Sequence, residues 1–473
     1  MRPLVCLLLA FLGLSAAERR PNILFILTDD QGYGDLSAHG NPVLKTPNLD
    51  KLRAESIRFV DFQVSPTCAP TRSALLTGRH EFKNGVTHTI LERERLALGA
   101  ATLAEQFQKA GYRTGIFGKW HLGDEAAYQP DKRGFDEVFI HGAGGIGQSY
   151  PGSCGDVPRN SYHGPTILHN GKFVKTVGYC TDEFFAQATR WIEGEAAAQR
   201  PFLAWIATNA PHAPYDAKPE DAALYEGKGL GKDTENFFGM IHNIDQNVGR
   251  ILARLEALGL AQDTLVVFMN DNGGTAGVKV FNAGMRAQKG TPYMGGIRAM
   301  SFWRLPGRFQ PGDVKALAAH IDFAPTLLEL TGTPASPTMQ AQMEGRSLLP
   351  LLTAKPGQEV AWPDRTLFTH VGRWNGADPE VGHYAQTSVR TARWHLVAAG
   401  NGQGAGKAKG KAAAKAGSTE TSPVKPNWQL FDLGVDYGET TDVAAQHPEV
   451  VAELAAKHEA WWKEVRPMMV NEG

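Results

Sequence analysis

The stretch PNILFILTDDQGYGDLS, residues 21–37, decides the class of fold. Its apolar run from Ile23 to Leu27 is the pattern of a strand buried on both faces, and the polar cluster Thr28-Asp29-Asp30 ends it. Strands buried on both faces belong to parallel sheets covered by helices. The segment therefore predicts the first strand of an α/β domain, with two carboxylates at its carboxyl end.

Similar segments follow along the chain. Further strands are expected over residues 112–117, 202–208 and 264–270, and helices over 46–56, 101–110, 182–195 and 234–258. The first of these helices begins at Thr46-Pro47, an N-cap followed by proline at the first helical position. This alternation predicts a large, mixed, mostly parallel sheet sandwiched by helices, with ligands bound beyond the carboxyl ends of the strands.

A second unit is expected after the segment GRSLLP at residues 345–350. Strands over 366–371, 384–391 and 394–398 and a helix over 448–465 predict a smaller α+β subdomain with an antiparallel sheet. We therefore expect a larger N-terminal domain over 18–345 and a C-terminal subdomain over 346–473. A Gly-, Ala- and Lys-rich insertion at about 400–426 is either a solvated hairpin or an arm that binds polyanions.

Composition and the N-terminal segment restrict the class of protein. The 473 residues are 42% hydrophobic and 21% charged, with a net charge of −1, which is typical of a globular protein and gives no basic face for nucleic acid. Residues 1–17 have the pattern of an export signal and are too short in their apolar run to span a bilayer. We expect a periplasmic or secreted protein that starts near Glu18 and has no membrane attachment once the signal is cleaved.

The cysteines add one open question. Of the four, Cys6 lies in the expected signal, so three remain in the mature chain. In an oxidising compartment Cys154 and Cys180 either form a disulfide or stay reduced, and the sequence leaves both alternatives open. Cys68 would then be the unpaired cysteine.

Two polar clusters end predicted strands. Asp29-Asp30 follows the first strand, and NDNGG at residues 270–274 follows the strand over 264–270. Either cluster alone is also compatible with a solvated turn. Because the carboxyl ends of parallel strands meet at one edge of a sheet, the two clusters together favour a site for a hard cation such as Ca²⁺ or Mg²⁺.

The segment CAPTR at residues 68–72 predicts a helix start. Pro70 suits the first turn of a helix, so Cys68 would lie at the helix N-terminus, where the helix dipole lowers the pKa of a thiol. Arg72 lies one turn further along. A buried structural cysteine and a disulfide partner are the alternatives.

These motifs carry a family resemblance. CAPTR followed by TGR at 77–79 resembles the first signature of the type I, formylglycine-dependent sulfatases of the alkaline phosphatase superfamily, which include bacterial arylsulfatases and polysaccharide sulfatases. GYRTGIFGKWH at 111–121 resembles their second signature. PHAP at 211–214, the later Lys289 and QLFDLGVDYGETTDVA at 429–444 match the family in type and order.

The resemblance implies a modified nucleophile and a metal. Cys68 would be converted by a maturation enzyme to formylglycine, whose hydrate supplies the attacking oxygen. One divalent cation, Ca²⁺ with Mg²⁺ as the alternative, would be ligated by Asp29, Asp30, Asp271, Asn272 and the modified residue 68.

The resemblance also implies roles for five other side chains. Arg72 and Lys119 would hold the hydrate and neutralise sulfate oxygens. His121 would accept a proton when the sulfated intermediate collapses, and His212 and Lys289 would bind the ester and protonate the leaving oxygen.

The sequence departs from the family pattern at two positions. Thr71 stands where Ser or Ala is commoner, and Met294 stands where glutamate is frequent. We expect the second change to alter loop packing or substrate contacts rather than the core reaction. Residues 275–288 separate Lys289 from NDNGG.

The function expected from these observations is an exported, Ca²⁺-dependent sulfatase that acts on sulfated carbohydrate, either polysaccharide or oligosaccharide fragments. The alternatives are a phosphoester or phosphonate monoester hydrolase, an arylsulfatase with small substrates, and a sulfated-glycan-binding protein in which Cys68 stays a thiol. Substrate contacts are expected from the Gly-rich region 141–164 and from the C-terminal unit. His141, His370 and Trp374 are the candidates.

Overall fold

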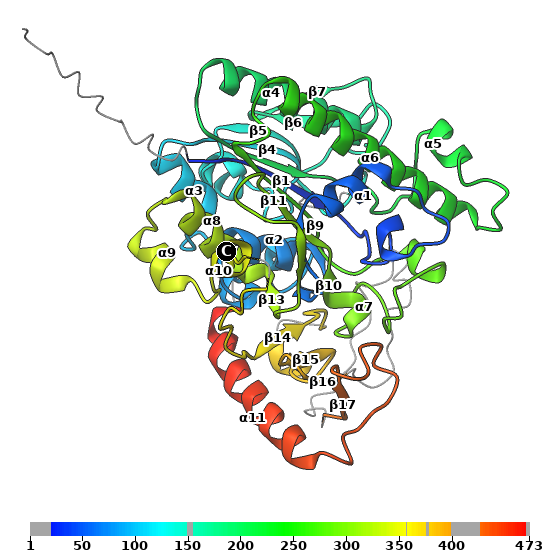
Figure 1. Cartoon of the computed structure of the whole chain (residues 1–473), viewed down its shortest axis with the longest axis vertical. Helices are drawn as coiled ribbons and strands as arrows, with labels where there is room; N and C mark the ends of the chain where they lie inside the picture. The colour runs from blue at the N-terminus through cyan, green and yellow to red at the C-terminus, as the bar shows by residue number, and fades with distance from the viewer. Residues whose placement is uncertain (1–19, 149–154, 356, 375–377, 399–425, 470–473) are drawn as a thin grey trace, which may run out of the picture.

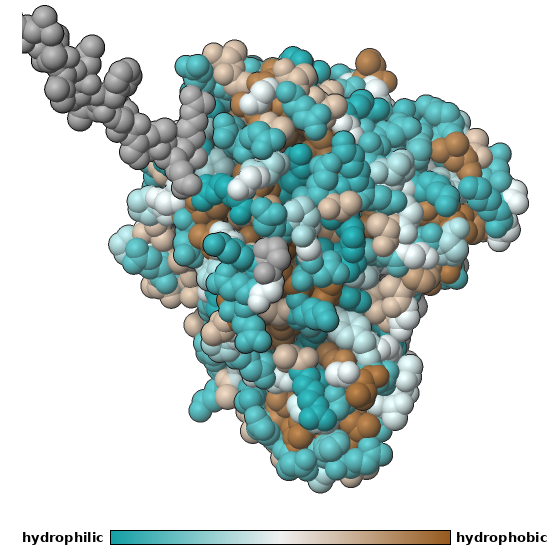
Figure 2. All heavy atoms as spheres, in the orientation of Figure 1, coloured by the Kyte–Doolittle hydropathy of each residue, from teal (hydrophilic) through white to brown (hydrophobic). Residues whose placement is uncertain are grey.

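The computed structural model describes residues 20–148, 155–355, 357–374, 378–398 and 426–469. The expected export signal, Cys154 and nearly all of the insertion at 400–426 fall outside these residues, so the predictions on them stay untested. Within the described ranges no helix is both long and apolar enough to cross a membrane. On the face shown in Figure 2, hydrophobic residues lie in small groups among hydrophilic ones, as on most globular proteins.

The main sheet has ten strands in the order β12-β2-β11-β9-β1-β8-β4-β5-β6-β7. The run β9-β1-β8-β4-β5 is parallel throughout, β12 is parallel to β2, and β11, β6 and β7 are antiparallel to their neighbours. This confirms the expected mixed, mostly parallel sheet. The strands span β1 Asn22–Thr28, β2 Ile57–Phe59, β4 Arg113–Lys119, β5 Glu137–His141, β6 Thr166–His169, β7 Lys172–Lys175, β8 Phe202–Ala207, β9 Thr264–Asn270, β11 Ser301–Arg304 and β12 Gly312–Val314.

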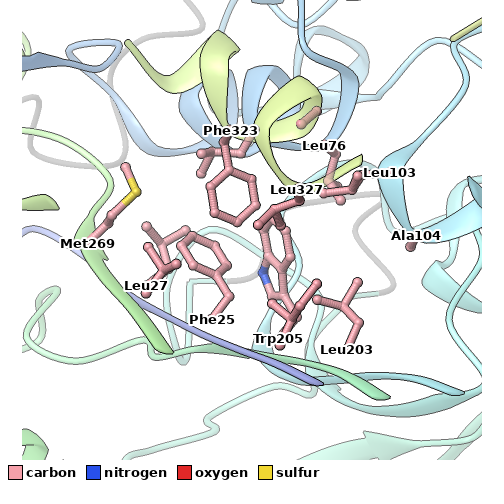
Figure 3. Close-up of a cluster of buried hydrophobic side chains, with 14 of the residues drawn as sticks. Phe25, Leu27, Leu76, Leu103, Ala104, Leu203, Trp205, Met269, Phe323 and Leu327 are labelled. Carbon is pink, nitrogen blue, oxygen red and sulfur yellow. The ribbon is translucent and has the colours of Figure 1, made fainter. Parts of the chain in front are cut away.

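Helices cover both faces of this sheet because side chains alternate along β1. Phe25 and Leu27 point into a core closed by α2, α3 and α8, shown in Figure 3, whereas Leu24 and Ile26 point into a second core closed by α1, α4 and α6. Each β1 side chain from Ile23 to Leu27 is fully buried. The helices span α1 Pro47–Ala54, α2 Cys68–Thr77, α3 Leu103–Lys109, α4 Cys180–Ala197, α6 Lys232–Ala257 and α8 Phe323–Thr331.

The predicted elements are present, with differences at their ends. The strand over 264–270 coincides with β9, whereas β4 runs two residues beyond the predicted end at 117. The helix expected over 46–56 ends at Ala54. Thr46 precedes it, but its hydroxyl contacts Ser37 and Asp50 and does not cap the helix backbone, because these two polar groups compete for it.

Short elements were not predicted from the sequence. A three-stranded sheet with the order β10-β3-β13 is built from two-residue strands, Arg298–Ala299, Phe62–Gln63 and Ala318–Ala319. Two residues are too few to show a period. Four short helices also lie outside the predictions: α5 Pro219–Ala223, α7 Met294–Ile297, α9 Pro337–Gln342 and α10 Leu349–Leu352.

The C-terminal unit is a four-stranded antiparallel sheet with one long helix, as expected (Figure 1). Its strands are β14 Leu367–His370, β15 Thr387–Arg390, β16 Trp394–Ala398 and β17 Trp428–Asp432, and its helix is α11 Pro448–Val465. Leu351 and Leu352 of α10, which lie after the expected boundary at 345, pack in the core of the main sheet. The exact division between the two units stays a prediction.

Candidate active site

The two polar clusters lie in contact at the carboxyl edge of the parallel strands. Thr28 at the end of β1 pairs with Asn270 at the end of β9, so the residues that follow emerge side by side. The backbone N–H of Asp30 donates to Asp271 Oδ1 at 3.2 Å, and the Asn272 amide donates to Asp30 Oδ1 at 3.0 Å. The structure thus brings together the four oxygen-bearing residues that sequence analysis singled out.

The helix α2 brings Cys68 and Arg72 to the same edge. Cys68 is the first residue of α2 and only 2% exposed, and extended Thr67 precedes it. One turn on, the Arg72 guanidinium donates to Asp271 Oδ2 at 2.8 Å and to the Lys119 carbonyl at 3.1 Å. The local sequence therefore forms the helix start that CAPTR predicts.

The end of β4 supplies Lys119 and His121. The ammonium of Lys119 lies 2.5 Å from Asp29 Oδ2, and neither side chain is exposed. His121 follows with a positive φ of 60°. Its Nε2 lies 3.0 Å from the Thr89 carbonyl and 3.2 Å from Glu94 Oε2, so two residues outside the sheet hold this ring nitrogen.

Two loops complete the cluster around Asp30. Lys289 forms an ion pair with Asp30, and His212 Nε2 lies 3.8 Å from the second oxygen of the same carboxylate. The backbone N–H of Lys289 donates to the Gly274 carbonyl at 3.2 Å. The segment 275–288 therefore returns to the NDNGG cluster, which explains how a distant lysine reaches the site.

Burial and neighbouring charges shift the pKa values of the three carboxylates in different directions. Burial, with the charge of Asp29 beside it, raises the pKa of Asp271 to about 7. Burial likewise raises the pKa of Asp29 to about 6, although Lys119 opposes the change. Burial also acts on Asp30, but there Lys289 and His212 outweigh it and hold the pKa well below the ordinary value.

The pKa values of Cys68 and His121 shift in opposite directions. Burial opposes ionisation of the Cys68 thiol, but the charges of Lys119 and His121 outweigh it and hold its pKa well below the ordinary value. Burial also disfavours a charged His121 ring, yet the Cys68 thiolate and Glu94 raise its pKa to about 9. The position of residue 68 therefore stabilises a negatively charged group.

The donor set suits a hard cation. Asp29 Oδ1 and Asn272 Oδ1 are buried and have no hydrogen-bond partner in the part of the chain that the structure describes. Ligand atoms of Asp29, Cys68 and Asp271 lie within 4.8 Å of one another, as do those of Asp29, Asp30 and His212. Buried oxygens without partners are costly unless a cation or water satisfies them. The residues present thus fit Ca²⁺ or Mg²⁺.

Two acidic residues near the site were missed by sequence analysis. Glu94 lies in the run LERER, which has the composition of an exposed charged turn, yet it is 3% exposed beside His121. Glu439 is fully buried, accepts a hydrogen bond from the Met294 N–H at 2.7 Å and contacts His395 Nδ1 at 2.6 Å. A carboxylate from the C-terminal subdomain therefore lies at the N-terminus of α7, beside Met294.

The candidate substrate residues are all buried. His141, at the end of β5, pairs in register with Lys119, but its ring is 1% exposed and contacts Asp156 at 3.0 Å and Asn209 at 3.0 Å. His370 is 1% exposed, and Trp374 is 8% exposed beneath the guanidinium of Arg93. Their substrate role stays a prediction, and in this structure each of them packs against protein.

The fold and the site together define an α/β enzyme. Positively charged side chains and oxygen ligands lie together at the edge of its sheet, an arrangement that suits an anionic substrate. Comparison with known proteins identifies it further. The Sulfatase family model matches residues 21–333, and the model of the N-sulphoglucosamine sulphohydrolase C-terminal region matches residues 289–402. The chain belongs to the sulfatase family and is a sulfuric ester hydrolase.

Named relatives agree with this assignment. Human arylsulfatase A is 32% identical over 482 residues, covering 95% of this chain and 89% of that protein. The N-acetylgalactosamine-6-sulfatase of Canis lupus familiaris is 34% identical over 405 residues, covering 78% and 72%. Among solved structures, Ps i-CgsB superposes with a TM-score of 0.78 at 25% identity, covering 96% of this chain and 95% of that one, and it is also known in complex with k-i-k-neocarrahexaose.

Proposed function

We propose that this sulfatase is exported and hydrolyses sulfate esters of carbohydrates, with formylglycine at position 68 and one bound Ca²⁺. The observation that carries the proposal is the convergence of Cys68, the oxygen ligands and buried cationic side chains at one edge of the sheet. Asp29 Oδ1 and Asn272 Oδ1 are buried without a hydrogen-bond partner among the described residues, which supports a bound cation.

In this proposal Asp29, Asp30, Asp271, Asn272 and residue 68 hold the cation, which adds positive charge where the ester oxygens lie. As formylglycine, residue 68 supplies the hydroxyl of a hydrated aldehyde as the nucleophile. Arg72 and Lys119 hold this residue and neutralise the sulfate group, since both positively charged side chains already pair with the carboxylates around it.

Two histidines and Lys289 move protons. His121 is held by Glu94 and the Thr89 carbonyl, and formylglycine would replace the Cys68 thiolate that raises the pKa of the ring, so the ring can accept a proton from residue 68. Lys289 and His212 lie on the Asp30 side of the cluster, where they bind the ester and protonate the leaving oxygen. Burial lowers the pKa of His212 to about 4, although Asp30 opposes the change, so Lys289 is the charged partner at neutral pH.

The substrate class rests on relatives. An N-acetylgalactosamine-6-sulfatase and a structure that holds a neocarrahexaose both resemble this chain over most of its length, which supports a sulfated carbohydrate as substrate. Export is supported by the signal pattern of residues 1–17. A catalytic domain over 18–345 followed by a C-terminal subdomain over 346–473 is part of the same proposal.

The nucleophile is tested by producing the chain together with a formylglycine-generating enzyme. Peptide mass spectrometry should find formylglycine at position 68, and hydrolysis of a sulfate ester should disappear in Cys68→Ala. Cys180→Ala is the matched control, because Cys180 is also a buried cysteine at the first residue of a helix but lies in α4. An active preparation whose residue 68 is entirely unmodified cysteine would overturn the proposal.

The substrate is tested with a panel of sulfated mono- and oligosaccharides measured beside a small aryl sulfate. We expect at least one carbohydrate sulfate to be hydrolysed with a higher kcat/KM than the aryl sulfate. Activity confined to the aryl sulfate would contradict the carbohydrate assignment while leaving the sulfatase chemistry intact.

A further inference from the structure

The C-terminal subdomain contains a second cluster of metal-ligating side chains. His383 follows the short 3₁₀ helix Pro379–Gly382, and His458 and Glu459 lie on α11. Glu459 Oε1 lies 3.5 Å from His383 Nε2 and 3.8 Å from His458 Nδ1. The three ligand atoms all lie within 4.8 Å of one another. None of these residues belongs to the sulfatase site, so this cluster is independent of the proposed function.

The protonation of His458 follows from its neighbours. The hydroxyl of Thr387 donates its only hydrogen to the Thr369 carbonyl at 2.8 Å, so it accepts from His458 Nε2, which lies 3.0 Å away. The hydrogen of this imidazole is therefore on Nε2. Its Nδ1 is buried, has no hydrogen-bond partner among the described residues, and faces the Glu459 carboxylate.

His383 is oriented toward the same point. Its ring stacks on Trp462, with centroids 4.6 Å apart and planes at 11°, and the side chain is 15% exposed. Within the described part of the chain its Nε2 also lacks a hydrogen-bond partner. Two buried ring nitrogens and a carboxylate oxygen thus converge without any hydrogen bond joining them, an arrangement that costs free energy unless something satisfies it.

We propose that His383, His458 and Glu459 bind one divalent transition-metal ion of the Zn²⁺ class. With metal–ligand distances of about 2.0–2.1 Å, the ligand atoms of a tetrahedral zinc site lie about 3.3 Å apart. The observed separations of 3.5 and 3.8 Å need only a small closure to reach that geometry. Two imidazoles and one carboxylate suit Zn²⁺ and leave a fourth position for water, whereas Ca²⁺ prefers an all-oxygen shell.

A neighbouring side chain supports the carboxylate. The Tyr384 hydroxyl donates to Glu459 Oε1 at 2.6 Å, as outer partners commonly do for metal-binding carboxylates. The ion would join the segment before β15 to the last turns of α11, two segments about 75 residues apart in the chain. Its role is to stabilise the C-terminal subdomain, and the sulfate-ester chemistry lies elsewhere.

The test measures Zn²⁺ binding to the full chain by titration calorimetry in excess Ca²⁺, which occupies the oxygen-ligand site at the sheet edge. We expect one Zn²⁺ per chain and a higher unfolding midpoint on binding. Glu459→Gln, at a side chain that is 49% exposed, should weaken Zn²⁺ binding at least tenfold, by analogy with other ligand losses. His447→Gln is the matched control, because it removes a histidine of the same subdomain from outside the cluster.

A second measurement reports the coordination geometry of the bound ion and leaves both buried histidines unaltered. Co²⁺ bound to the unaltered protein should show the visible absorption of a tetrahedral site, and Glu459→Gln should abolish it. The proposal is overturned if the unaltered chain binds no Zn²⁺ in excess Ca²⁺, or if Glu459→Gln and His447→Gln bind it equally well. It is also overturned if the bound Zn²⁺ is lost in Asp29→Asn but retained in Glu459→Gln.

Discussion

At the scale of single residues, Lys119 and Asp29 form a buried ion pair. Their charged atoms lie 2.5 Å apart, and both side chains are fully buried. Asp29 also has Asp30 beside it in the chain, and the charge of Asp271 is close by. The pair therefore limits repulsion among buried carboxylates, a task that a bound cation would share.

We predict that Lys119→Met reduces kcat/KM for sulfate esters by about 10²–10³-fold, because a fixed positive charge at the reacting group is lost. Breaking the buried pair should also destabilise the chain by about 3–5 kcal/mol without Ca²⁺. This loss of stability should be smaller in excess Ca²⁺, since the cation compensates the charge of Asp29.

Thermal unfolding with a chelator and with excess Ca²⁺ checks this prediction. Lys132→Met is the control, because Lys132 carries the same charge in a 63% exposed side chain, and it should change neither activity nor stability. A Lys119→Met destabilisation that is the same with and without Ca²⁺ would argue against a cation at Asp29.

His370 shows how the structure separates a structural role from a substrate role. Its Nε2–H donates to the Gly382 carbonyl at 2.8 Å, and its Nδ1 accepts from the Gly372 N–H at 2.9 Å. Both nitrogens of the neutral ring are therefore satisfied by backbone. Burial lowers the pKa of this ring to about 3, from an ordinary value of 6.5.

We predict that His370 makes stability depend on pH. Between pH 6.5 and about 3 the unfolded chain binds a proton on this ring that the folded chain does not. The contribution of His370 to the free energy of unfolding is therefore complete above about pH 6.5 and is lost as the pH falls, by at most about 1.4 kcal/mol per pH unit.

The measurement compares urea unfolding of the unaltered chain with His370→Gln, whose amide can make both backbone hydrogen bonds. Their difference in stability should narrow as the pH falls from about 7 to about 4. If His370 contacts substrate instead, the difference will not vary with pH and KM will rise in the variant.

At the scale of elements, the end of β4 depends on a close approach to β8. Gly118 has a φ of +114° and pairs in register with Ala207, and a Cβ at this position would lie 1.8 Å from the Ala207 carbonyl oxygen. Only glycine meets both requirements. The two strands can therefore hold Lys119 and His121, which follow Gly118, at the edge of the sheet.

We predict that Gly118→Ala destabilises the protein by about 3 kcal/mol or more and lowers activity, because the strand end must move away from β8. Gly194→Ala is the matched control on α4, where the added methyl meets no described atom within 4 Å. It should stabilise the chain by about 0.5–1 kcal/mol, since alanine favours a helix over glycine. Similar unfolding midpoints for the two variants would contradict the argument.

The elements also show what local pattern can and cannot predict. The buried strand 264–270 and the helix 448–465 were predicted to the residue, because long apolar runs and a proline start are local signals. The two-residue strands β3, β10 and β13 were not, since they form only where distant segments meet. The sequence Thr46-Pro47 likewise indicates where a helix starts, but it does not indicate which group the Thr46 hydroxyl bonds.

At the scale of the whole molecule, a buried ion pair joins the C-terminal sheet to the main domain. Arg390, at the end of β15, pairs with both oxygens of Asp61, which lies between β2 and β3. The Tyr437 hydroxyl donates to the same carboxylate at 2.8 Å. The Arg390 side chain is only 1% exposed, so its charge depends on this partner.

We predict that Asp61→Ala destabilises the chain by about 3–5 kcal/mol, because it leaves a buried guanidinium unpaired. Arg393→Ala removes the ion pair between Asp432 of β17 and an Arg393 side chain that is 63% exposed, and it should leave the unfolding midpoint unchanged. Limited proteolysis of Asp61→Ala should release the C-terminal subdomain first. Equal midpoints for the two variants would show that this pair does not couple the two units.

The chemistry of the candidate site could be predicted from the amino-acid sequence alone. Cys68, Arg72, Lys119 and the NDNGG cluster were recognisable because each lies in a short local motif at the end of a strand or the start of a helix. Their convergence also followed from the sequence, because the carboxyl ends of parallel strands meet at one edge.

The partners that surround these residues became visible only in the three-dimensional structure. Four pairs of residues join segments that are far apart in the chain. They are Glu94 with His121, Glu439 with Met294, Asp61 with Arg390, and His383 with His458. The backbone partners of both His370 ring nitrogens were fixed in the same way. The physical reason is that periodicity along a chain records whether a side chain is buried, whereas its partner depends on how separate elements pack.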